Sequence, residues 1–476
     1  MLGLPVATPW ATIEANQRLF IPNPALAQPV RGSSFLVPMK PFDLQSLLEL
    51  FDKSTGITTD TRECGPGMLF FALRGERFNG NAFAQKAIDA GCLAAIIDDT
   101  TLQGTSFFLV DDVLAALQQL ARCHRNRFSG PVFGLTGSNG KTTTKELLRT
   151  VLSQKFKVYA TKGNLNNHIG VPLTLLSMPQ DVEFALVEMG ANHQGEIAEL
   201  AKIANPNYGM ITNVGHAHLE GFGGIEGVKK GKQELFVHLA AEHGYAFVPS
   251  ADSDLVALAN VNGLQRIEFG TREHPPLVWR AGEAPQSPIC WSLDGSNNAG
   301  PWHVNGRPTP VQLEGRHQLA NMTAAIAVGH HFGVSQEEIG DALEKFQPVS
   351  QRGETVQTEQ NVVVVDCYNA NPSSVESTLR SFAAARHKAP LAILGDMLEL
   401  GEYAAQGHQL VREVCRECTM ECWVVGPQFK EHAQGDFTFQ NLEDLQDHLV
   451  AHPLQGRTIL LKGSRSMQLE RLVAAL

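Results

Sequence analysis

The chain has 476 residues, of which 43% are hydrophobic and 18% charged, a composition typical of a globular protein with about two to four domains. Its formal net charge of −11 argues against a basic surface that would bind nucleic acid or anionic lipid. No secretory signal and no apolar run of about 18 residues is visible. We therefore expect a cytoplasmic protein without a membrane span, with its eight cysteines as free thiols.

Residues 1–38 are rich in Pro, Ala and Asn and lack clear periodicity, so we expect a poorly structured extension there, with Met39 as an alternative start. Organised sequence follows over residues 39–128. An amphipathic helix over 41–52 precedes the strand GMLFFAL, the helix AFAQKAIDAG and the strand LAAIID. These elements predict a small mixed α/β domain, which the helix DVLAALQQLARCHRNRF connects to the next one.

Residues 129–313 alternate short apolar strands with helices. The strands VFGLTG, FALVEMG and YGMITNVG each precede a helix, and YAFVPS follows the last of these helices. Continuous apolar strands that alternate with helices indicate a parallel, doubly wound sheet. The end of this segment, residues 270–313, is rich in Pro, Gly, Ser and Trp and indicates irregular β structure.

Residues 314–476 repeat this alternation after the opening helix HQLANMTAAIAVGHHF. The strands are VVVVDC, LAILGD, CWVVG and TILLKGS, and a final helix is predicted in SMQLERLVAAL. The predicted fold class is therefore α/β with three domains. These are a small mixed α/β N-terminal domain, a central parallel-sheet domain and a C-terminal Rossmann-like α/β domain.

The cysteines form one cluster, in the segment VCRECTMECW. Its spacing places the sulfurs of Cys415, Cys418 and Cys422 on one helix face. A zinc site would need a further pair of ligands elsewhere, and no second pair is evident. We interpret the three as partly buried structural thiols.

Polar and glycine residues recur at, or one or two positions beyond, the ends of apolar strands in both larger domains. In open parallel sheets, ligands bind outside the carboxyl ends of the strands, where such residues meet. Loops are polar in any case, but the same placement in two consecutive domains predicts a shared ligand cleft. The residues at these positions are Gly137–Thr142, Glu188, His216, His218, Asp366, Asp396 and Lys462.

The segment GLTGSNGKTTTKELL has the chemistry of a phosphate loop with an unusual glycine spacing. The common pattern G-x-x-x-x-G-K-[ST] would place its first glycine at Leu135. Gly137 and Gly140 can still adopt positive φ and turn backbone N–H groups toward phosphate, while Lys141 adds a positive charge and Thr142 offers a hydroxyl to Mg²⁺. In its strand–loop–helix context, the segment predicts that the central domain binds a nucleotide through a P-loop-like segment.

Further side chains could serve a metal or remain structural. Glu188 suits a hard cation, although a glutamate at a strand end also caps helices or pairs on the surface. His216 and His218 alternate with Ala217, so an extended segment would point both the same way, but no third zinc ligand is placed nearby. By pattern alone, Lys232 is a solvated lysine on a charged helix face.

The loop TGSNGKTTT resembles the ATP loop of the Mur ligase family, whose members have TG-[ST]-NGKT in place of the longer pattern. The resemblance covers residues 41–476, including TTDTR and GMLFFALRGERFNGNAFAQKA in the first domain. One departure is Cys367, in a segment where Val365 stands at a position that is a second Asp in many members. We expect little functional effect, because Asp366, Tyr368 and Asn371 remain in place. The other similar segments are GNLNNHIGVPLTLL, VEMGANHQGEI, ITNVGHAHLEGFG, KGKQELF, EGRHQLANMTAA, DCYNANPSS, LGDMLELG and LKGSRSM.

YNANP and GDMLELG are similar to motifs of the members that add D-alanyl-D-alanine to UDP-N-acetylmuramoyl-tripeptide. The resemblance implies an ATP-dependent amide ligase of peptidoglycan precursor synthesis, with Mg²⁺ at a first and a second site and a monomeric chain. A carboxylate resists attack by an amine, so ATP would first convert it into an acyl phosphate with a good leaving group. The alternatives are a sibling ligase that uses another amine or a folate, and a non-catalytic nucleotide-binding switch.

The resemblance also implies roles for individual residues. Lys232 would react with CO₂ to form a carbamate that binds Mg²⁺, for which its amine must be neutral, and Lys230 is the alternative position. The catalytic residues would be Lys141, Glu188, His218 and Lys232, and the metal ligands Thr142, Glu188, His218 and Lys232.

By the same resemblance, ATP would lie between the central and third domains, whose closure would assemble the site and exclude water. The ATP contacts would be Gly137, Ser138, Asn139, Gly140, Lys141, Thr142, Thr143, Asn321, Arg352 and Asp366. The dipeptide side would comprise Tyr368, Asn371, Asp396, Lys462, Ser464 and Arg465. The tripeptide carboxylate would lie near Asn164, Asn166 and Asn167, and the uridine end near Thr61, Arg62 and Arg74.

Overall fold

The structure is a computed structural model that describes residues 43–76, 78–270, 291–293, 302–304, 307–309, 317–347, 353–385 and 387–476. The expectations for residues 1–38 and for Arg352 lie outside these ranges. The described residues all belong to one compact unit, Phe42–Leu476. Within these ranges no helix has the length and apolar character needed to cross a membrane.

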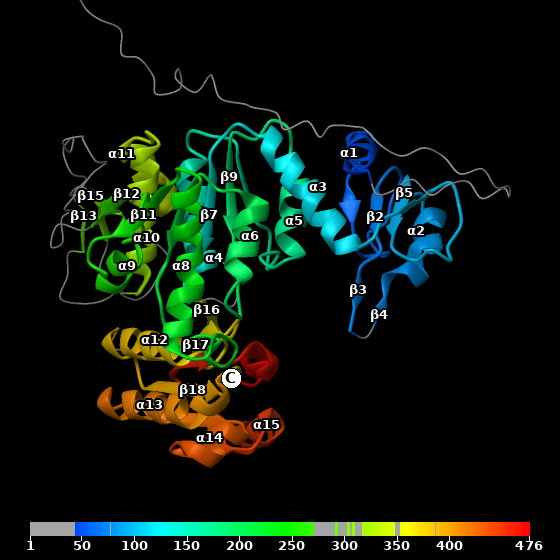
Figure 1. The fold of residues 1–476 in the computed structure, drawn as a ribbon. Coiled ribbons are helices and arrows are strands. Elements are labelled where there is room, and N and C mark those ends of the chain that lie inside the picture. Colours follow the sequence, from blue (N-terminus) through cyan, green and yellow to red (C-terminus); the bar gives the residue numbers. More distant parts are fainter. Residues whose placement is uncertain are drawn as a thin grey trace, which may run out of the picture. The chain divides into compact units, whose positions relative to one another are not determined.

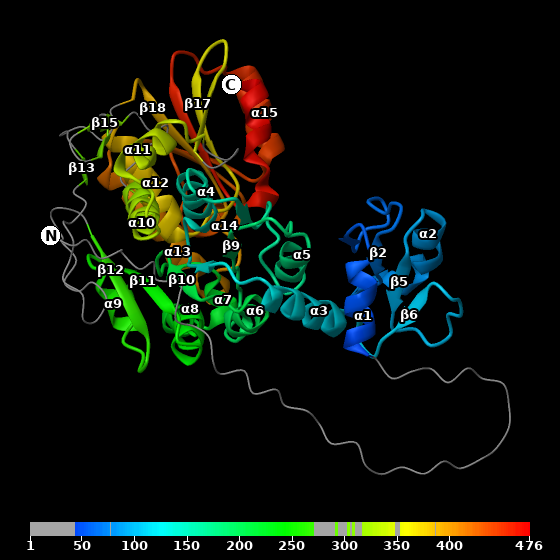
Figure 2. The ribbon, with the colours of Figure 1, turned by 90° about the horizontal axis from the view of Figure 1, so that it is seen from above.

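The N-terminal domain is a small parallel sheet flanked by helices. Its elements are α1 (Leu44–Asp52), β1 (Ile57–Thr58), β2 (Leu69–Phe71), β3 (Arg74–Gly75), β4 (Phe78–Asn79), η1 (Gly80–Phe83), α2 (Ala84–Asp89), β5 (Ala94–Ile97), β6 (Phe107–Leu109) and α3 (Val113–Arg127). The sheet order is β1-β2-β5-β6. Phe70 and Ile97 pack with α2, whereas Phe71 and Ile96 pack with α1 and α3, because alternate residues of a strand face opposite sides. Figure 2 shows α1 and α2 on opposite sides of this sheet.

The central domain is a larger parallel sheet with helices on both faces (Figure 1). Its elements are β7 (Val132–Thr136), α4 (Lys141–Leu152), β8 (Val158–Ala160), α5 (Gly170–Leu176), β9 (Phe184–Glu188), α6 (Glu196–Ala204), β10 (Tyr208–Ile211), α7 (Leu219–Phe222), α8 (Ile225–Ala241), β11 (Tyr245–Pro249), α9 (Ser253–Leu258), β12 (Gln265–Phe269), β13 (Trp291–Leu293), β14 (Trp302–Val304), β15 (Arg307–Thr309), α10 (His317–His331) and α11 (Gln336–Glu344). The main sheet has the order β12-β11-β10-β7-β9-β8 with parallel pairings, and β13-β14-β15 form a separate antiparallel sheet. β8 and β9 lie on one side of β7, and the chain then crosses to β10 on the other side. Doubly wound sheets bind ligands where the strand order reverses in this way.

Two hydrophobic clusters cover the two faces of the central sheet. Phe133 and Leu186 pack with α4, α10 and α11, while Val132 and Val187 pack with α3, α5, α6 and α8. The sequence places the start of the third domain at residue 314, but by their contacts α10 and α11 belong to the central sheet. The reason is the apolar surface that they share with α4, illustrated by Gly329, where an added Cβ would collide with Val151. The next sheet begins only with β16, at Glu354.

The C-terminal domain is a second doubly wound sheet. Its elements are β16 (Glu354–Gln357), β17 (Val362–Asp366), α12 (Pro372–Ala384), β18 (Pro390–Gly395), η2 (Gly401–Tyr403), α13 (Ala404–Glu417), β19 (Glu421–Val425), α14 (Pro427–His432), β20 (Phe437–Phe439), α15 (Leu442–Ala451), β21 (Thr458–Lys462), η3 (Arg465–Met467) and η4 (Leu469–Ala475). The order is β16-β17-β21-β18-β19-β20, in which only β16 is antiparallel to its neighbour. Leu394 and Leu460 face α12, α13 and α14, whereas Ile393 and Leu461 face α15 and η4.

Two expectations for the C-terminal domain are wrong in detail. The final segment forms the 3₁₀ turns η3 and η4 in place of one α-helix. The three cysteines do not share a helix face, because Cys415 lies in α13, Cys418 is its C-cap and Cys422 lies in β19. Between them the chain reverses at Thr419, whose φ is 51°. The described residues contain no cluster of His, Cys, Asp and Glu arranged to hold a metal by themselves.

Helix starts follow from local capping chemistry. The Asp112 side chain caps α3, Ser335 and Glu338 form a capping box at α11, and Asn371 caps α12. In contrast, α4 begins after Gly140, which has a φ of 77° and provides no side-chain cap. The N–H groups in the first turn of α4 therefore have no capping side chain at Gly140, and such a helix end can bind an anion.

Candidate active site

A cavity of about 890 Å³ lies at the carboxyl ends of β7, β9 and β10 and is also lined by residues of the C-terminal domain. It brings together strand ends of two sheets that lie far apart in the sequence. Among the residues singled out from the sequence, those that line the cavity are Ser138, Asn139, Gly140, Lys141, Thr142, Thr143, Asn166, Asn167, Glu188, His218, Asn321, Asp366, Tyr368 and Lys462.

The loop between β7 and α4 forms a tight cradle. Gly137 and Gly140 have φ values of 146° and 77°, a region that glycine enters without strain. The backbone also packs closely, since a Cβ on Gly137 would collide with Thr212. The Lys141 ammonium lies over the loop and donates to the carbonyl oxygens of Gly137 at 2.7 Å and Ser138 at 3.1 Å. The lysine thus lies beside the N-terminus of α4, and a positive charge at a helix N-terminus favours phosphate.

Glu188 presents a buried carboxylate beside this cradle and is only 2% exposed. Thr142 Oγ1 donates to Glu188 Oε2 at 3.0 Å, and Asn166 Nδ2 donates to Oε1 at 2.9 Å. A hydroxyl and a carboxylate in contact are hard oxygen donors of the kind that Mg²⁺ prefers. The donor set therefore fits this ion.

Lys145 is a neighbour of this carboxylate that sequence reasoning missed. Its side chain is 1% exposed, its Nζ donates to the Thr161 carbonyl at 2.6 Å, and it lies 3.7 Å from Glu188 Oε2. The available signal was its position one helical turn after Lys141, which places both lysines on one face of α4. The ammonium offsets part of the cost of burying Glu188.

The two histidines after β10 have different surroundings. His218 lines the cavity with a left-handed backbone (φ 53°), and its Nδ1 lies 2.5 Å from Glu399 Oε2. Hydrogen bonding to His218 lowers the pKa of the Glu399 carboxyl. His216 is exposed, and its Nδ1 lies 3.2 Å from Ser373 Oγ. The expectation that both rings point the same way depends on an extended segment. The left-handed backbone of His218 ends that extended segment, so the expectation is wrong.

Lys232 is buried in α8, unlike the solvated lysine that its pattern alone indicates. Its side chain is 1% exposed, and its Nζ lies 5.0 Å from the centre of the Phe222 ring. Burial, and then the positive charge of Lys141, lower the pKa of Lys232 to about 7. Lys230, the alternative position, is exposed. An amine with such a pKa is partly neutral near neutral pH, which is the state that reacts with CO₂.

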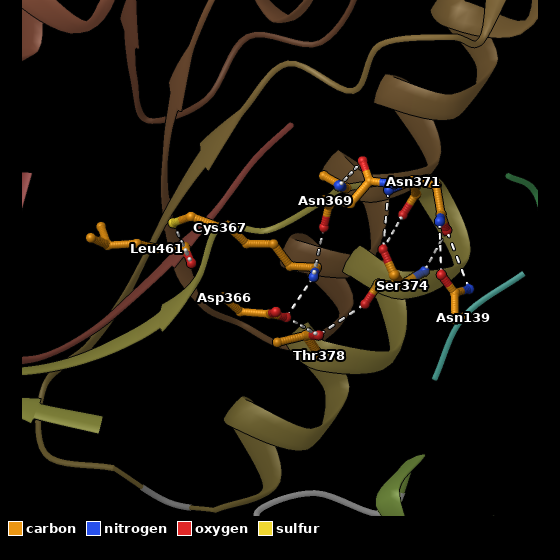
Figure 3. A network of polar contacts seen from close by, with 10 residues as sticks. Asn139, Asp366, Cys367, Asn369, Asn371, Ser374, Thr378 and Leu461 are labelled. Carbon is orange, nitrogen blue, oxygen red and sulfur yellow. Dashed lines mark hydrogen bonds and ion pairs between the residues drawn. The ribbon is translucent and has the colours of Figure 1, made fainter. Parts of the chain in front are cut away.

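The C-terminal domain contributes an ion pair at the ends of two neighbouring strands. Lys462 Nζ lies 2.5 Å from Asp366 Oδ2, and Thr378 Oγ1 of α12 donates to the same oxygen at 3.2 Å. Figure 3 shows Asp366 and Thr378 side by side between β17 and α12. Tyr368 lines the cavity two residues farther on. A carboxylate, an ammonium and a phenol therefore lie on this wall of the cavity.

Asn321 reaches the cavity from α10. Its Oδ1 accepts from Thr144 Oγ1 at 3.0 Å, and its Nδ2 donates to Gln318 Oε1 at 2.7 Å. Gln318 also lines the cavity, although sequence reasoning did not single it out. The signal was again spacing, because residues three apart on a helix share a face. The Asn321 amide thus lies beside the phosphate loop, on the side of the central domain.

The three asparagines expected near the tripeptide carboxylate divide in the structure. Asn166 contacts Glu188, as described, and Asn167 Oδ1 accepts from the backbone N–H of Gly170 at 2.9 Å where α5 begins. Asn164 is exposed and does not line the cavity. Two of the three therefore lie on the cavity wall.

Four residues expected on the dipeptide side, Asn371, Asp396, Ser464 and Arg465, are not among the residues that line the cavity. Asn371 caps α12. The Asp396 oxygens accept two backbone N–H groups at the start of α14, both at 2.9 Å. Ser464 Oγ accepts from the backbone N–H of Leu398 at 2.9 Å. Arg465 is exposed, with its Nη1 3.7 Å from Glu470. A strand end can also face the start of the helix that follows the neighbouring strand, as Asp396 after β18 faces α14 after β19. The N–H groups of that helix need acceptors, and this need accounts for Asp396.

The residues expected at the uridine end lie in the N-terminal domain, outside the cavity lining. Arg62 pairs with Asp60 at 2.5 Å, and Arg74 Nε lies 2.8 Å from Asp98. Thr61, between Asp60 and Arg62 in the sequence, is half-buried. Both guanidinium groups remain partly exposed and thus accessible to an anionic ligand.

Three stretches of the chain match domains of one family. Residues 53–124 match the Mur ligase family, catalytic domain, residues 135–329 the Mur ligase middle domain, and residues 351–465 the Mur ligase, glutamate ligase domain. The second match includes most of α10, in agreement with the packing of this helix on the central sheet.

Proteins and structures from several bacteria are similar over most of the chain. The UDP-N-acetylmuramoyl-tripeptide--D-alanyl-D-alanine ligase of Bacillus subtilis (strain 168) is 32% identical over 434 residues, covering 88% of this chain and 92% of that protein. The Escherichia coli (strain K12) protein of the same name is 33% identical, covering 88% and 93%. The crystal structure of MurF from Acinetobacter baumannii has a TM-score of 0.77 at 30% identity, covering 92% and 99%. The MurF ligase of Thermotoga maritima in complex with ADP has a TM-score of 0.75 at 28% identity, covering 90% and 97%. With its domains matched in order and its relatives aligned over most of their length, this chain belongs to the Mur ligase family.

Proposed function

We propose that this protein is an ATP-dependent ligase that joins D-alanyl-D-alanine to UDP-N-acetylmuramoyl-tripeptide and releases ADP and phosphate. The observation that carries the proposal is the cavity, where the phosphate loop and Glu188 of one sheet meet Asp366 and Lys462 of another. Such a cavity can align three reactants, which is the main requirement of this reaction. The relatives named for this reaction, which cover 88% of the chain, support the choice of substrates.

The central domain would bind and neutralise the triphosphate. Backbone N–H groups of the loop and the Lys141 ammonium would contact the phosphate oxygens. Thr142, Glu188 and His218 would hold Mg²⁺, and this ion would supply charge neutralisation at the transferred phosphoryl group. The contact of Thr142 with Glu188 supports this assignment, because both ligands already lie within 3.2 Å of each other.

Lys232 would provide a second anionic ligand as a carbamate. Its neutral amine would attack CO₂, form a C–N bond and release a proton, which converts a cationic side chain into a carboxylate-like one. The burial of Lys232 and its lowered pKa support this role, whereas Lys230 is exposed and lacks such surroundings.

The remaining steps assign the other walls of the cavity. The tripeptide carboxylate, near Asn166 and Asn167, would attack the γ-phosphate, and ADP would leave. The amine of the dipeptide, oriented by Tyr368 and Lys462, would then attack the acyl phosphate carbonyl, and phosphate would leave. Exclusion of water from the cavity would protect the acyl phosphate.

Further contacts complete the proposal. Asn321, Arg352 and Asp366 would bind the adenosine and phosphate groups of ATP. Asp396, Ser464 and Arg465 would support the dipeptide side through the segments that they hold, and Asn371 would act there as well. Asn164 would serve the tripeptide, and Thr61, Arg62 and Arg74 the uridine end. We place the enzyme in the cytoplasm as a monomer, and a dimeric mass in sedimentation equilibrium would contradict the monomer.

Phosphate release from ATP tests the proposed reaction. With UDP-N-acetylmuramoyl-tripeptide and Mg²⁺ present, release should require D-alanyl-D-alanine and stop when Mg²⁺ is removed with EDTA. Lys141→Met should abolish release, whereas Lys155→Met, beyond the end of the same helix, should retain it. Release that is independent of the dipeptide would contradict the proposal, and a preference for another amine in a substrate panel would indicate a sibling ligase.

A further inference from the structure

A pair of side-chain amides connects the phosphate loop to the C-terminal domain. Asn371 Nδ2 donates to Asn139 Oδ1 at 2.8 Å, and Asn139 Nδ2 lies 3.4 Å from Asn371 Oδ1. Figure 3 shows the two amides facing each other, one from the loop after β7 and one from the start of α12. The residues are 232 positions apart in the chain, so this reciprocal pair is a tertiary contact made at the edge of the cavity.

The backbone of Asn139 is already held within the central domain. Its N–H donates to Asn213 Oδ1 at 3.0 Å, and its carbonyl accepts from Thr212 Oγ1 at 2.6 Å and from Asn213 Nδ2 at 2.9 Å. These three bonds satisfy both backbone groups. The Asn139 side chain therefore adds a contact that the local backbone hydrogen bonds do not require.

The cap of α12 likewise uses only part of the Asn371 side chain. Asn371 Oδ1 accepts from the Ser374 backbone N–H at 2.9 Å, and the Asn371 N–H donates to Ser374 Oγ at 3.0 Å. An N-cap needs an acceptor, and serine supplies one about as well as asparagine. The NH₂ group of Asn371 has no role in the cap, and its bond goes to Asn139.

The same helix touches two other parts of the cavity. Ser373 Oγ accepts from the His216 backbone N–H at 2.8 Å, beside the loop that carries His218. Thr378 donates to Asp366 at the end of β17. The N-terminal part of α12 therefore contacts the phosphate loop and His216 of the central domain, and Asp366 of its own domain.

We propose that Asn371 is a positioning residue that, through its amide pair with Asn139, fixes the phosphate loop in register with the C-terminal domain during phosphoryl transfer. The proposal rests on the proposed ligase function. It assigns to Asn371 an action through the loop, in addition to its role as a helix cap. The loop is then held from two domains only when α12 is in place.

The decisive variant is Asn371→Ser, which retains an acceptor for the cap and removes the amide that pairs with Asn139. We expect kcat for dipeptide-dependent phosphate release to fall about three- to tenfold, because the hydrogen bonds that hold the loop are lost. The thermal midpoint should stay near the wild-type value, because serine retains an acceptor for the cap of α12.

The matched control is Asn441→Ser, at the N-cap of α15, where Oδ1 accepts from the Asp444 N–H at 2.8 Å in the same way. Asn441 begins α15, which packs against β20 and η4, so the control should have the wild-type kcat. A wild-type kcat for Asn371→Ser would overturn the proposal, and so would an equal loss in Asn441→Ser.

Asn139→Ser tests the pair from the other side without touching the cap of α12, and it therefore decides the question even if Asn371→Ser is less stable. When two residues act only through their contact with each other, the loss of kcat in the double variant is smaller than the two single losses combined. The double variant should lose no more kcat than the more impaired single variant. Losses that multiply in the double variant would show two independent roles and contradict the pairing.

Hydrogen–deuterium exchange provides a readout that does not need ligation. With a non-hydrolysable ATP analogue and Mg²⁺, amides of residues 137–142 should exchange faster in Asn371→Ser than in the wild type. Identical exchange would overturn the positioning role. If the wild-type protein releases no phosphate in response to the dipeptide, the proposed function fails, while the exchange experiment still decides whether Asn371 holds the loop.

Discussion

Two buried charged residues of the central domain have opposite surroundings. Glu188 is surrounded by donors, with the Thr142 hydroxyl and the Asn166 amide on its oxygens. Lys232 instead faces the Phe222 ring, and burial lowers the pKa of its amine to about 7. The first environment supports a charged group that holds a cation, and the second favours a neutral, nucleophilic amine. Each residue therefore makes a separate prediction.

Glu188→Gln should lower kcat on the order of a hundredfold, because an amide has no charge with which to hold Mg²⁺. The Gln side chain is close in volume, so the thermal midpoint should change little. The matched control is Glu268→Gln, a buried glutamate of β12 in the same sheet that does not line the cavity. Steady-state phosphate release as a function of Mg²⁺ concentration measures the effect, and an unchanged Mg²⁺ dependence would exclude Glu188 as a ligand.

Lys232→Ala should reduce activity by a similar factor, and added short-chain carboxylic acids should restore part of it, because they supply the lost carboxylate. Lys230→Ala, with an exposed lysine on the same helix, serves as the control and should retain activity. Turnover is measured with and without acetate. Full activity of Lys232→Ala would contradict the proposal that Lys232 carries the carbamate. Rescue by acetate that occurs only in Lys230→Ala would contradict it as well.

At the scale of elements, the packing of α13 depends on a neutral histidine. His408 is fully buried, its Nδ1 lies 2.7 Å from the Ala404 carbonyl, and its Nε2 accepts from the Met397 N–H at 3.1 Å. One ring nitrogen is thus a donor and the other an acceptor, which is the pattern of an uncharged imidazole. Desolvation lowers the pKa of His408 below its ordinary value. The segment after β18 and the start of α13 are held together by this ring.

The stability of the C-terminal domain should therefore fall as pH drops below about 6.5, the ordinary pKa of histidine. Below that pH the unfolded chain takes up a proton that folded His408 does not, so the free energy of unfolding decreases with falling pH. His408→Gln should have a smaller decrease than the wild type, and His452→Gln, at an exposed histidine of the same domain, should match the wild type. Calorimetric midpoints between pH 5 and 8 test this, and parallel curves for the wild type and His408→Gln would contradict it.

At the scale of the whole molecule, two loops of the larger domains meet at His218. Glu399, with a left-handed backbone (φ 63°), places its carboxylate 2.5 Å from His218 Nδ1. Nearby, an added Cβ on Gly401 would lie 3.0 Å from the Glu220 side chain, so the two loops are in close contact. Because His218 lines the cavity, the C-terminal domain influences a proposed metal ligand directly.

Glu399→Ala should lower kcat about three- to tenfold, because the His218 ring loses a charge-assisted contact that orients it. The Glu399 side chain is 57% exposed, so the midpoint of unfolding should change little. Glu402→Ala, at an exposed residue three positions farther along the chain, is the control and should behave as the wild type. Measuring kcat and the thermal midpoint on the same samples separates an effect on catalysis from one on stability. A kcat equal to that of Glu402→Ala would contradict the proposal that Glu399 orients His218.

The α/β class, the succession of strands and helices, and the polar residues at strand ends could be predicted from the amino-acid sequence, because these features depend on local periodicity and on spacing along one chain. Glu188 and Lys462 could be placed in this way, since a residue that ends a buried parallel strand must emerge at the carboxyl edge of its sheet. The family resemblance added the assignment of the loop to ATP.

Which of these residues share a cavity, and which are buried elsewhere, could be seen only in the folded chain. Lysine is usually a surface residue, and nothing in the local sequence marks Lys232 or Lys145 as an exception. Both are buried because α8 and α4 pack against other elements. Asp396 occupies a strand end like Glu188, yet the start of α14 takes its oxygens. The attachment of α10 to the central sheet likewise depends on contacts between distant segments. Such contacts are set by the free energy of packing, to which residues far apart in sequence contribute, and no local pattern encodes them.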